Sequence, residues 1–214
     1  MPDDHILQWG NPALYEQARP IQVFDDLVHA QAARLCRKLE AADGAGLAAT
    51  QVGSLRRMFA FRFSPEHETD VLVNPRIVWR SHEQELFHEG CLSFLSVVVV
   101  VRRPVAVRVV GYSIDGDERE LECEAFEASL MQHEIDHLDG VLTLHRAEPE
   151  ERYRAITALL AGRSADSSQA AWPITTPRSV GGGAAERDHR ASRSPLDRRL
   201  GRGVSLVGPV TGRI

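Results

Sequence analysis

The motif HEIDH at residues 133–137 restricts the fold of this chain more than any other feature of its sequence. Side chains four residues apart lie on the same face of an α-helix, so a helix here would carry both imidazoles to a single metal ion. Glu134 directly follows the first histidine and is near enough to hold a water molecule at the metal and take its proton. We therefore expect a helix over residues 126–138 that bears a metal site and closes at Gly140.

A catalytic metal site usually has three protein ligands and one open position, so two histidines leave the site incomplete. One candidate third ligand lies upstream: Cys91 in the segment EGCLS at 89–93, where Gly90 allows a tight backbone turn that would present a thiolate. The downstream candidates follow no second motif and are His145, Glu148, Glu150 and Glu151. The other two cysteines, Cys36 and Cys123, fit the pattern of small buried hydrophobic residues.

A glycine-rich segment, GAGLAATQ at 44–51, is the third feature with chemical content. Its glycines permit a close approach of the backbone to a ligand, and Gln51 can offer a side-chain N–H to an oxyanion. It is not a nucleotide loop, because no Lys-Ser/Thr pair follows and it comes after a helix rather than a strand. The alternative interpretation is an ordinary glycine-rich helix stop.

Hydrophobic periodicity predicts the remaining elements. An amphipathic helix over 25–41 begins near Asp25, and its apolar residues at helical spacing are Leu27, Val28, Ala32, Leu35, Cys36 and Leu39. We expect strands at 58–63 and 70–79, two or three antiparallel strands within 97–126, and a final helix at 149–160. Because the strands run consecutively between helices, the predicted fold class is α+β: antiparallel β-sheets around the helix of the HEIDH motif, with an N-terminal and a C-terminal helix.

Charge and composition divide the chain near Gly162. Residues 1–162 carry 16 Lys and Arg against 26 Asp and Glu, whereas residues 163–214 carry 9 Arg against 4 acidic residues. The second segment is rich in Ser, Gly, Pro and Arg and has too few large apolar residues to form a core. We expect a catalytic domain at 1–162 and a basic, low-complexity, disordered tail at 163–214, with an arm that touches RNA or an acidic surface as the alternative for the tail.

Net charge, hydrophobic runs and cysteine spacing together indicate the cellular compartment and the kinds of partner. The net charge of -5 argues against a general nucleic-acid binder. No apolar run approaches the ~20 residues of a membrane helix, and the N-terminus lacks the apolar segment of a secretory signal. Three widely spaced cysteines do not form the pattern of a disulfide framework. We therefore expect a cytoplasmic protein without DNA or membrane partners.

Taken together and in order, GAGLAATQ at 44–51, EGCLS at 89–93 and QHEIDHLDG at 132–140 resemble the three motifs of the peptide deformylases. The resemblance covers most of residues 1–162, including the entry helix, Asn74-Pro75 after a strand and the final helix, but not the tail. The family removes the N-formyl group from the N-terminal methionine of new bacterial or organellar proteins. The resemblance implies a bacterial cytoplasmic hydrolase that acts on N-formylmethionyl nascent peptides, contacts the ribosome transiently and works as a monomer.

The resemblance also implies roles for individual residues. Cys91, His133 and His137 would bind one divalent metal ion, Fe²⁺ in the cell, although Zn²⁺, Ni²⁺ or Co²⁺ can take the same position. Glu134 would be the general base and then the general acid. The positions that would hold the oxyanion or border the substrate are Gln51, the backbone N–H of Leu92, and Gly46.

Residues around these ligands are expected to orient them. The family has a buried ion pair near the cysteine ligand, which we assign here to Glu89 and Arg103 rather than Arg102. Asp136 faces away from the two histidines by helical spacing, and it either orients a neighbouring group or is a solvated charge.

The chain departs from the family pattern directly after EGCLS. Family members commonly have a proline two residues further on and then a polar loop, whereas this chain has Leu95 and five consecutive valines within residues 94–101. This segment lines the substrate cleft in the family, so the departure favours, as an alternative to the deformylase, a related metal hydrolase with an altered N-acyl or peptide substrate. A second alternative is a non-catalytic homologue that binds nascent chains or the ribosome, which the complete ligand set and Glu134 argue against.

Overall fold

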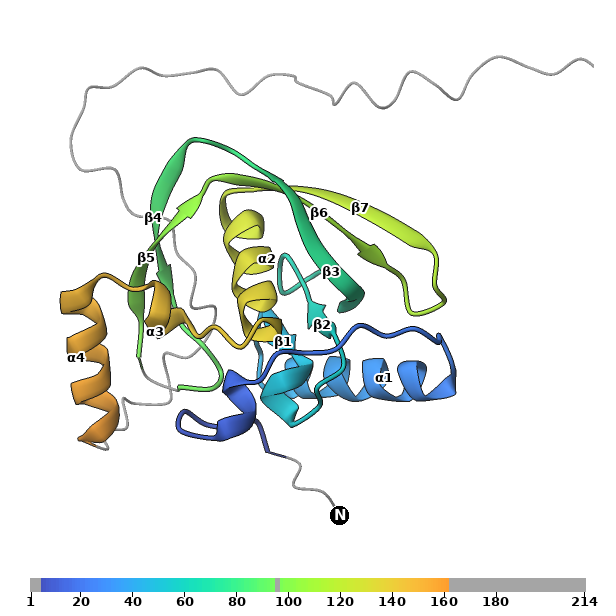
Figure 1. The fold of residues 1–214 in the computed structure, drawn as a ribbon, viewed down its shortest axis with the longest axis horizontal. Coiled ribbons are helices and arrows are strands. Elements are labelled where there is room, and N and C mark those ends of the chain that lie inside the picture. The colour runs from blue at the N-terminus through green and yellow to red at the C-terminus, as the bar shows by residue number, and fades with distance from the viewer. Residues whose placement is uncertain (1–4, 95–96, 162–214) are drawn as a thin grey trace, which may run out of the picture. The chain divides into compact units, whose positions relative to one another are not determined.

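The computed structural model describes residues 5–94 and 97–161 (Figure 1), all of which belong to one compact unit. The expected tail at 163–214 lies outside the described residues. The elements in chain order are the 3₁₀ helix η1 Pro12–Tyr15, α1 Asp26–Ala41, β1 Gly46–Ala48, the 3₁₀ helix η2 Ala49–Val52, β2 Met58–Phe61, β3 Asp70–Arg80, β4 Gln84–Glu89, β5 Val99–Pro104, β6 Ala106–Tyr112, β7 Glu118–Glu124, α2 Ala125–Leu138, α3 Thr143–Arg146 and α4 Pro149–Leu160. The sequence did not predict β1, β4 or the short helices.

The strands form two antiparallel sheets. The larger sheet has the order β1-β2-β3-β6-β7, and β4 pairs with β5 in a separate two-stranded sheet. A register shift interrupts β3 near Asn74, whose φ of 49° is unusual for a strand residue. The Asn74 side chain binds both the N–H and the carbonyl of Ile21 at 2.7 Å. The prediction of a mixed helix and antiparallel-sheet fold is confirmed.

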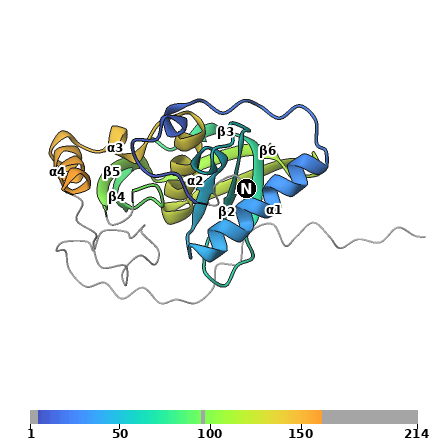
Figure 2. The ribbon, with the colours of Figure 1, turned by 90° about the horizontal axis from the view of Figure 1, so that it is seen from below.

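The strand β2 is buried on both faces of the larger sheet, because successive side chains of a strand point to opposite faces and all its residues are buried. On β2, Met58 and Ala60 belong to the hydrophobic cluster of α1, whereas Phe59 and Phe61 belong to the cluster that contains apolar residues of α2. Figure 2 shows α1 running across one face of this sheet, and α1 contacts β1, β2 and β3. The sheet therefore separates α1 from α2 and supports the central helix from one side.

The first helix begins as predicted. Oδ1 of Asp25 accepts a hydrogen bond from the N–H of Val28 at 3.2 Å, which is the N-cap arrangement. Val28, Ala32, Leu35 and Leu39 are buried. Leu27 is different: 55% of it is exposed, although its spacing predicts a place on the apolar face.

The helix α2 lies between the two sheets and contacts strands of both (Figure 1). Its residues from Ala128 to Leu138 are all buried, including polar ones. The helix ends before Gly140, whose φ is 72° and whose position would bring a Cβ within 2.5 Å of the carbonyl oxygen of Tyr15. Glycine is therefore required there for two reasons. Within the described ranges, no helix is long and apolar enough to cross a membrane.

The valine-rich segment builds a core of its own. Val97, Val99 and Val101 are buried, whereas 55% of Val98 is exposed, so the side chains alternate as in a half-buried strand. The buried valines pack in one cluster with Leu142 and with residues of α4. The departure from the family pattern therefore supplies packing between β5 and the C-terminal helices.

Candidate metal centre

Three potential metal ligands converge on the central helix. The ligand atoms of Cys91, His133 and His137 all lie within 4.8 Å of one another, and all three residues are buried. Sγ of Cys91 is 3.1 Å from Nε2 of His137. In the part of the chain that the structure describes, no other group of three His, Cys, Asp or Glu side chains meets in this way. The upstream cysteine, rather than a downstream residue, therefore joins the two histidines.

The two histidines differ in their surroundings. Nδ1 of His133 lies 3.0 Å from Oε2 of Glu89, and a proton shared there leaves Nε2 free to bind a metal. Burial opposes a charge on His133, but Cys91 and Glu89 outweigh burial and raise its pKa well above the ordinary value. Burial and the charges of His133 and Arg103 lower the pKa of His137, which stays neutral. The negative surroundings that favour a proton on His133 would equally favour a metal cation.

A buried ion pair holds Glu89 in position. Arg103 donates from Nε to Oε1 at 2.5 Å and from Nη2 to Oε2 at 2.9 Å, and Ser129 donates to Oε1 at 2.8 Å. Burial would raise the pKa of Glu89, but Arg103 and His133 hold it well below its usual range. The carboxylate is therefore ionised and has its lone pairs occupied. The structure pairs Glu89 with Arg103, while Arg102 is exposed.

Asp136 is not a solvated charge. It is buried, and its Oδ2 atom accepts a hydrogen bond from Nη1 of Arg103 at 2.8 Å. Arg146 binds the same carboxylate from the other side. Of the two interpretations of Asp136, the structure therefore supports the orienting one.

Glu134 is the second buried carboxylate beside the histidines, and it has fewer partners than Glu89. Its Oε2 atom is buried and has no hydrogen-bond partner among the described residues. Burial raises the pKa of Glu134 to about 7, although the charge of His133 opposes this rise. A carboxyl group with that pKa can take up and release a proton near neutral pH.

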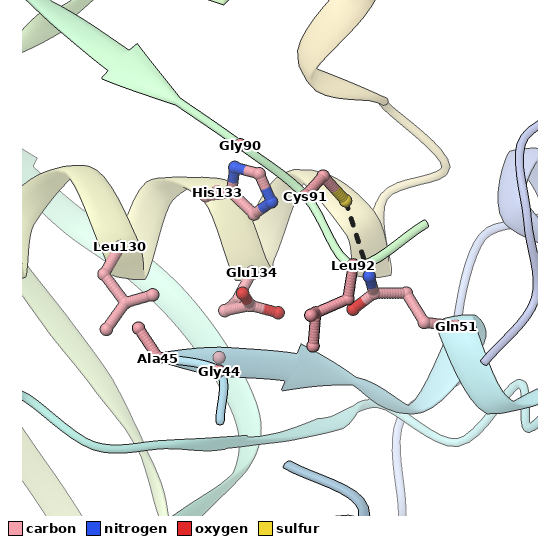
Figure 3. A pocket seen from close by; sticks show the side chains of 10 residues that line it. Gly44, Ala45, Gln51, Gly90, Cys91, Leu92, Leu130, His133 and Glu134 are labelled. Atoms are coloured by element: carbon pink, nitrogen blue, oxygen red, sulfur yellow. Dashed lines mark hydrogen bonds between the residues drawn. The ribbon is translucent and has the colours of Figure 1, made fainter. Parts of the chain in front are cut away.

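The side chain of Gln51 is held beside Cys91 by hydrogen bonds. Its Oε1 atom accepts a hydrogen bond from the N–H of Ala48 at 2.8 Å, which determines where its amide nitrogen points. That nitrogen lies 3.1 Å from Oγ of Ser93. It also lies 3.5 Å from Sγ of Cys91, the contact that is dashed in Figure 3. The neighbouring Thr50 donates to the carbonyl of His137 at 3.1 Å and so connects η2 to α2.

Gln51, Cys91 and Glu134 are among the residues that line a pocket of about 380 Å³, a volume that includes the open space at its mouth. In Figure 3 the carboxylate of Glu134 lies between α2 and the strand β1, with Cys91, Gln51 and Leu92 on one side and Leu130 on the other. The remaining lining residues are Gly44, Ala45, Gly46, Gly90 and His133. The arrangement combines buried apolar surface with a few convergent polar groups, as binding sites typically do.

Sequence reasoning missed several residues that contact this centre. Ser93, Ser129 and Thr143 are buried hydroxyl residues that touch Gln51, Glu89 and His133 respectively. Ser93 ends the EGCLS segment but received no role there, and no local pattern marks Ser129 or Thr143. Each of the three meets its partner through tertiary packing. The downstream candidates do not reach the cluster; His145, for example, accepts a hydrogen bond from the N–H of Leu142 instead.

Comparison with known proteins identifies the family. The family model described as polypeptide deformylase matches residues 4–153. The chain belongs to the polypeptide deformylase family. It is 36% identical to a peptide deformylase of Thermotoga neapolitana, over 67% of this chain and 87% of the relative. It is also 36% identical to a protein of Rhizobium meliloti named peptide deformylase-like, over 71% of this chain and 88% of the relative.

The fold agrees with solved deformylase structures. A crystal structure of a peptide deformylase from Legionella pneumophila has a TM-score of 0.69 and 32% sequence identity, with coverage of 73% of this chain and 93% of that chain. Peptide deformylases are metal-dependent hydrolases, and this chain fits a metal ion on the chemistry of its donors. One thiol and two imidazoles lie together, the outer nitrogen of His133 is occupied by Glu89, and the pocket lies beside them.

Proposed function

We propose that this protein is an enzyme that removes the N-formyl group from the N-terminal methionine of newly synthesised proteins and releases formate. One observation carries this conclusion. In a polypeptide deformylase fold, the buried cluster of Cys91, His133 and His137 borders a pocket that also contains Glu134, a carboxylate with an oxygen that has no partner among the described residues. A purely structural metal site has no use for such a base and no open pocket.

Cys91, His133 and His137 are the proposed ligands of one divalent metal ion. When bound, the ion supplies Lewis-acid polarisation of the formyl carbonyl and lowers the pKa of water. The thiolate and imidazole donors suit Fe²⁺, Zn²⁺, Co²⁺ and Ni²⁺ alike. We take Fe²⁺ as the resident ion from the resemblance of the three motifs to the family. Glu89 and Arg103 serve as the pair that orients His133.

Glu134 is the proposed general base and general acid. Its ionised carboxylate accepts a proton from the attacking water molecule and then passes that proton to the nitrogen of the leaving amine. A pKa of about 7 suits both transfers, because the group is neither too weak a base nor too weak an acid near neutral pH. The unoccupied Oε2 atom is available for the water molecule.

Gln51 and Leu92 are the proposed donors to the oxyanion that forms on the formyl group. The Gln51 amide nitrogen already lies 3.5 Å from Sγ of Cys91, so it is close to the ligand cluster, and its orientation is held by Ala48. A donor that is fixed in advance needs no reorganisation when the charge develops. Gly46 borders the substrate and leaves room for Glu134.

N-Formylmethionyl nascent peptides are the proposed substrates. We further propose a monomer in the bacterial cytoplasm that contacts the ribosome transiently. Sedimentation tests the oligomeric state. Co-sedimentation with purified ribosomes at two salt concentrations tests the ribosome contact.

Formate release tests the activity itself. The protein is purified anaerobically with Fe²⁺. Formate release from formyl-Met-Ala-Ser is measured beside acetate release from acetyl-Met-Ala-Ser, with the unblocked peptide as the blank. Release from the formyl peptide alone, abolished in Glu134→Ala with the metal still bound, is the expected result. A metal-loaded protein that releases no formate, or that prefers the acetyl peptide, would overturn the proposal and favour an altered substrate.

A further inference from the structure

A chain of charged side chains leads from His133 to the protein surface. Glu89 binds His133, and Arg103 binds Glu89 through Nε and Nη2. The third nitrogen of that guanidinium, Nη1, donates to Oδ2 of Asp136 at 2.8 Å. These inner members are buried: the exposed fractions of the side chains are 0% for Glu89, 5% for Arg103 and 10% for Asp136.

Arg146 is the outermost member of this chain of contacts. Its Nη2 atom donates to Oδ1 of Asp136 at 2.6 Å and its Nε atom donates to Oδ2 at 3.1 Å. Half of its side chain is exposed, so Arg146 lies between the buried charges and the solvent. Arg146 ends α3, a short helix that contacts β5, whereas Asp136 is on α2 and Arg103 is on β5. The contact thus joins three separate elements.

We propose that Arg146 is a positioning residue for the metal centre. By occupying both oxygens of Asp136, it fixes this carboxylate, which in turn fixes the plane of the Arg103 guanidinium. Arg103 can then hold Glu89 with two parallel hydrogen bonds, and Glu89 orients the imidazole of His133. The inference rests on the proposed metal site at Cys91, His133 and His137.

The charge of Arg146 and its geometry act on a bound cation in opposite directions. Removal of the positive charge of Arg146 removes a repulsion and so favours binding of the cation. This repulsion is weak, because a half-exposed charge is screened by water and salt. Loss of the two hydrogen bonds leaves Asp136 to compete with Glu89 for Arg103, which loosens His133. Solvent and salt weaken the effect of the surface charge, but they do not weaken the effect of losing the hydrogen bonds that hold the buried groups. Removal of Arg146 is therefore expected to weaken metal binding.

The experiment measures metal binding by the full-length protein. Apo-protein is titrated anaerobically with Co²⁺, and the dissociation constant and the visible absorption bands are recorded for the wild type, Arg146→Met and Arg146→Lys. We expect Arg146→Met to bind about 3- to 10-fold more weakly, less than the 10- to 100-fold typical of a direct partner of a ligand. The bands of its complex should shift or broaden. Arg146→Lys keeps the positive charge but cannot make the bidentate contact, so its Co²⁺ affinity should lie between those of Arg146→Met and the wild type.

Arg119→Met is the matched control. Arg119 donates to both oxygens of Asp70 at 2.9 and 2.7 Å, and this ion pair is also partly exposed. Its loss removes a similar contact outside the charge chain, so the Co²⁺ affinity and bands should equal those of the wild type. Equal or tighter binding by Arg146→Met, full restoration by Arg146→Lys, or the same loss in the control would each overturn the inference. A wild type that binds no Co²⁺ would overturn the proposed metal site instead.

Discussion

Glu134 lies directly against the backbone of Gly46: a Cβ at position 46 would come within 2.6 Å of Cδ and 2.8 Å of Cγ of the glutamate. Real Cβ atoms do not approach other atoms this closely, so one of the two residues would have to move. The glycine belongs to β1 and the glutamate to α2. The requirement for glycine at this position therefore comes from the carboxylate across the pocket.

Gly46→Ala should reduce deformylation by about 100-fold or more, because a shift of roughly 1 Å in a catalytic group has that effect. The metal content should be unchanged, since position 46 does not touch a ligand of the proposed ion. Gly44→Ala is the comparison, because its Cβ would meet only the flexible ends of Leu39 and Leu92 at 2.8 and 2.9 Å. Steady-state kinetics of both variants would show the larger loss in Gly46→Ala; equal losses would contradict the explanation.

Glu134→Gln should abolish turnover and yet stabilise the metal-free protein in mild alkali. Burial raises the pKa of Glu134 from 4.5 to about 7 in the folded protein. The folded state thus binds the proton more tightly, so the carboxyl's contribution to stability is complete below pH 4.5 and lost as the pH rises through about 7. A shift of this size corresponds to roughly 3 kcal/mol. Urea unfolding should favour the variant at about pH 8 and show little difference at about pH 4.5. Equal stability of the two proteins at the higher pH would rule this out.

Gln51→Ala should lower kcat by about 100- to 1,000-fold, the usual effect of losing one oxyanion donor. The KM should change little, because the donor acts mainly on the charge that develops in the transition state. Gln51→Glu keeps the size and the contact geometry at Ala48 but replaces the amide N–H by an acceptor, so it should be equally impaired. Retention of full activity by either variant would exclude the proposed role.

Val99→Ala should cost about 2 kcal/mol of unfolding free energy, because it removes two buried methyl groups and leaves a cavity. Only 1% of Val99 is exposed, against 55% of its neighbour Val98. Val98→Ala should therefore change the free energy of unfolding by less than about 0.5 kcal/mol. Chemical unfolding of the two variants measures the difference. Similar losses in both would mean that the alternation of the valines does not persist in solution.

Oxidation of the protein should occur at Cys91 and should depend on the metal. Peroxide treatment of the Fe²⁺ protein should stop formate release and add oxygen to Cys91. In the Zn²⁺ protein, both the activity and the thiol of Cys91 should be preserved. Cys123 is an internal reference, because burial and then Glu127 raise the pKa of its thiol to about 12, so the reactive thiolate is scarce. Mass spectrometry of peptides from the treated protein identifies the modified cysteine. Oxidation chiefly at Cys123 would contradict the expectation.

Local patterns were sufficient to predict most of the secondary structure. The apolar spacing predicted α1 and α4, and the HEIDH motif predicted α2, because helical periodicity is written into a single stretch of chain. The same reasoning failed for Leu27, which follows the period but is exposed at the edge of the apolar face. It also missed β1, which is only three residues long and pairs with β2 at the sheet edge. Short strands depend on their partners more than on their own residues.

The sequence was enough to predict a metal site with imidazole ligands, the position of two histidines on one helix face, and the resemblance to the peptide deformylases. From residues alone, Cys91 and four downstream residues were all open as the third member of the cluster. Three contacts became visible in the folded protein alone: Cys91 joins the histidines, Glu134 lies against Gly46, and Asp136 is bound by Arg103 and Arg146. Each of these contacts joins segments that are far apart along the chain, so no local pattern reveals it. Periodicity reports which residues share a face, whereas contacts between remote segments arise from packing of the two sheets around α2.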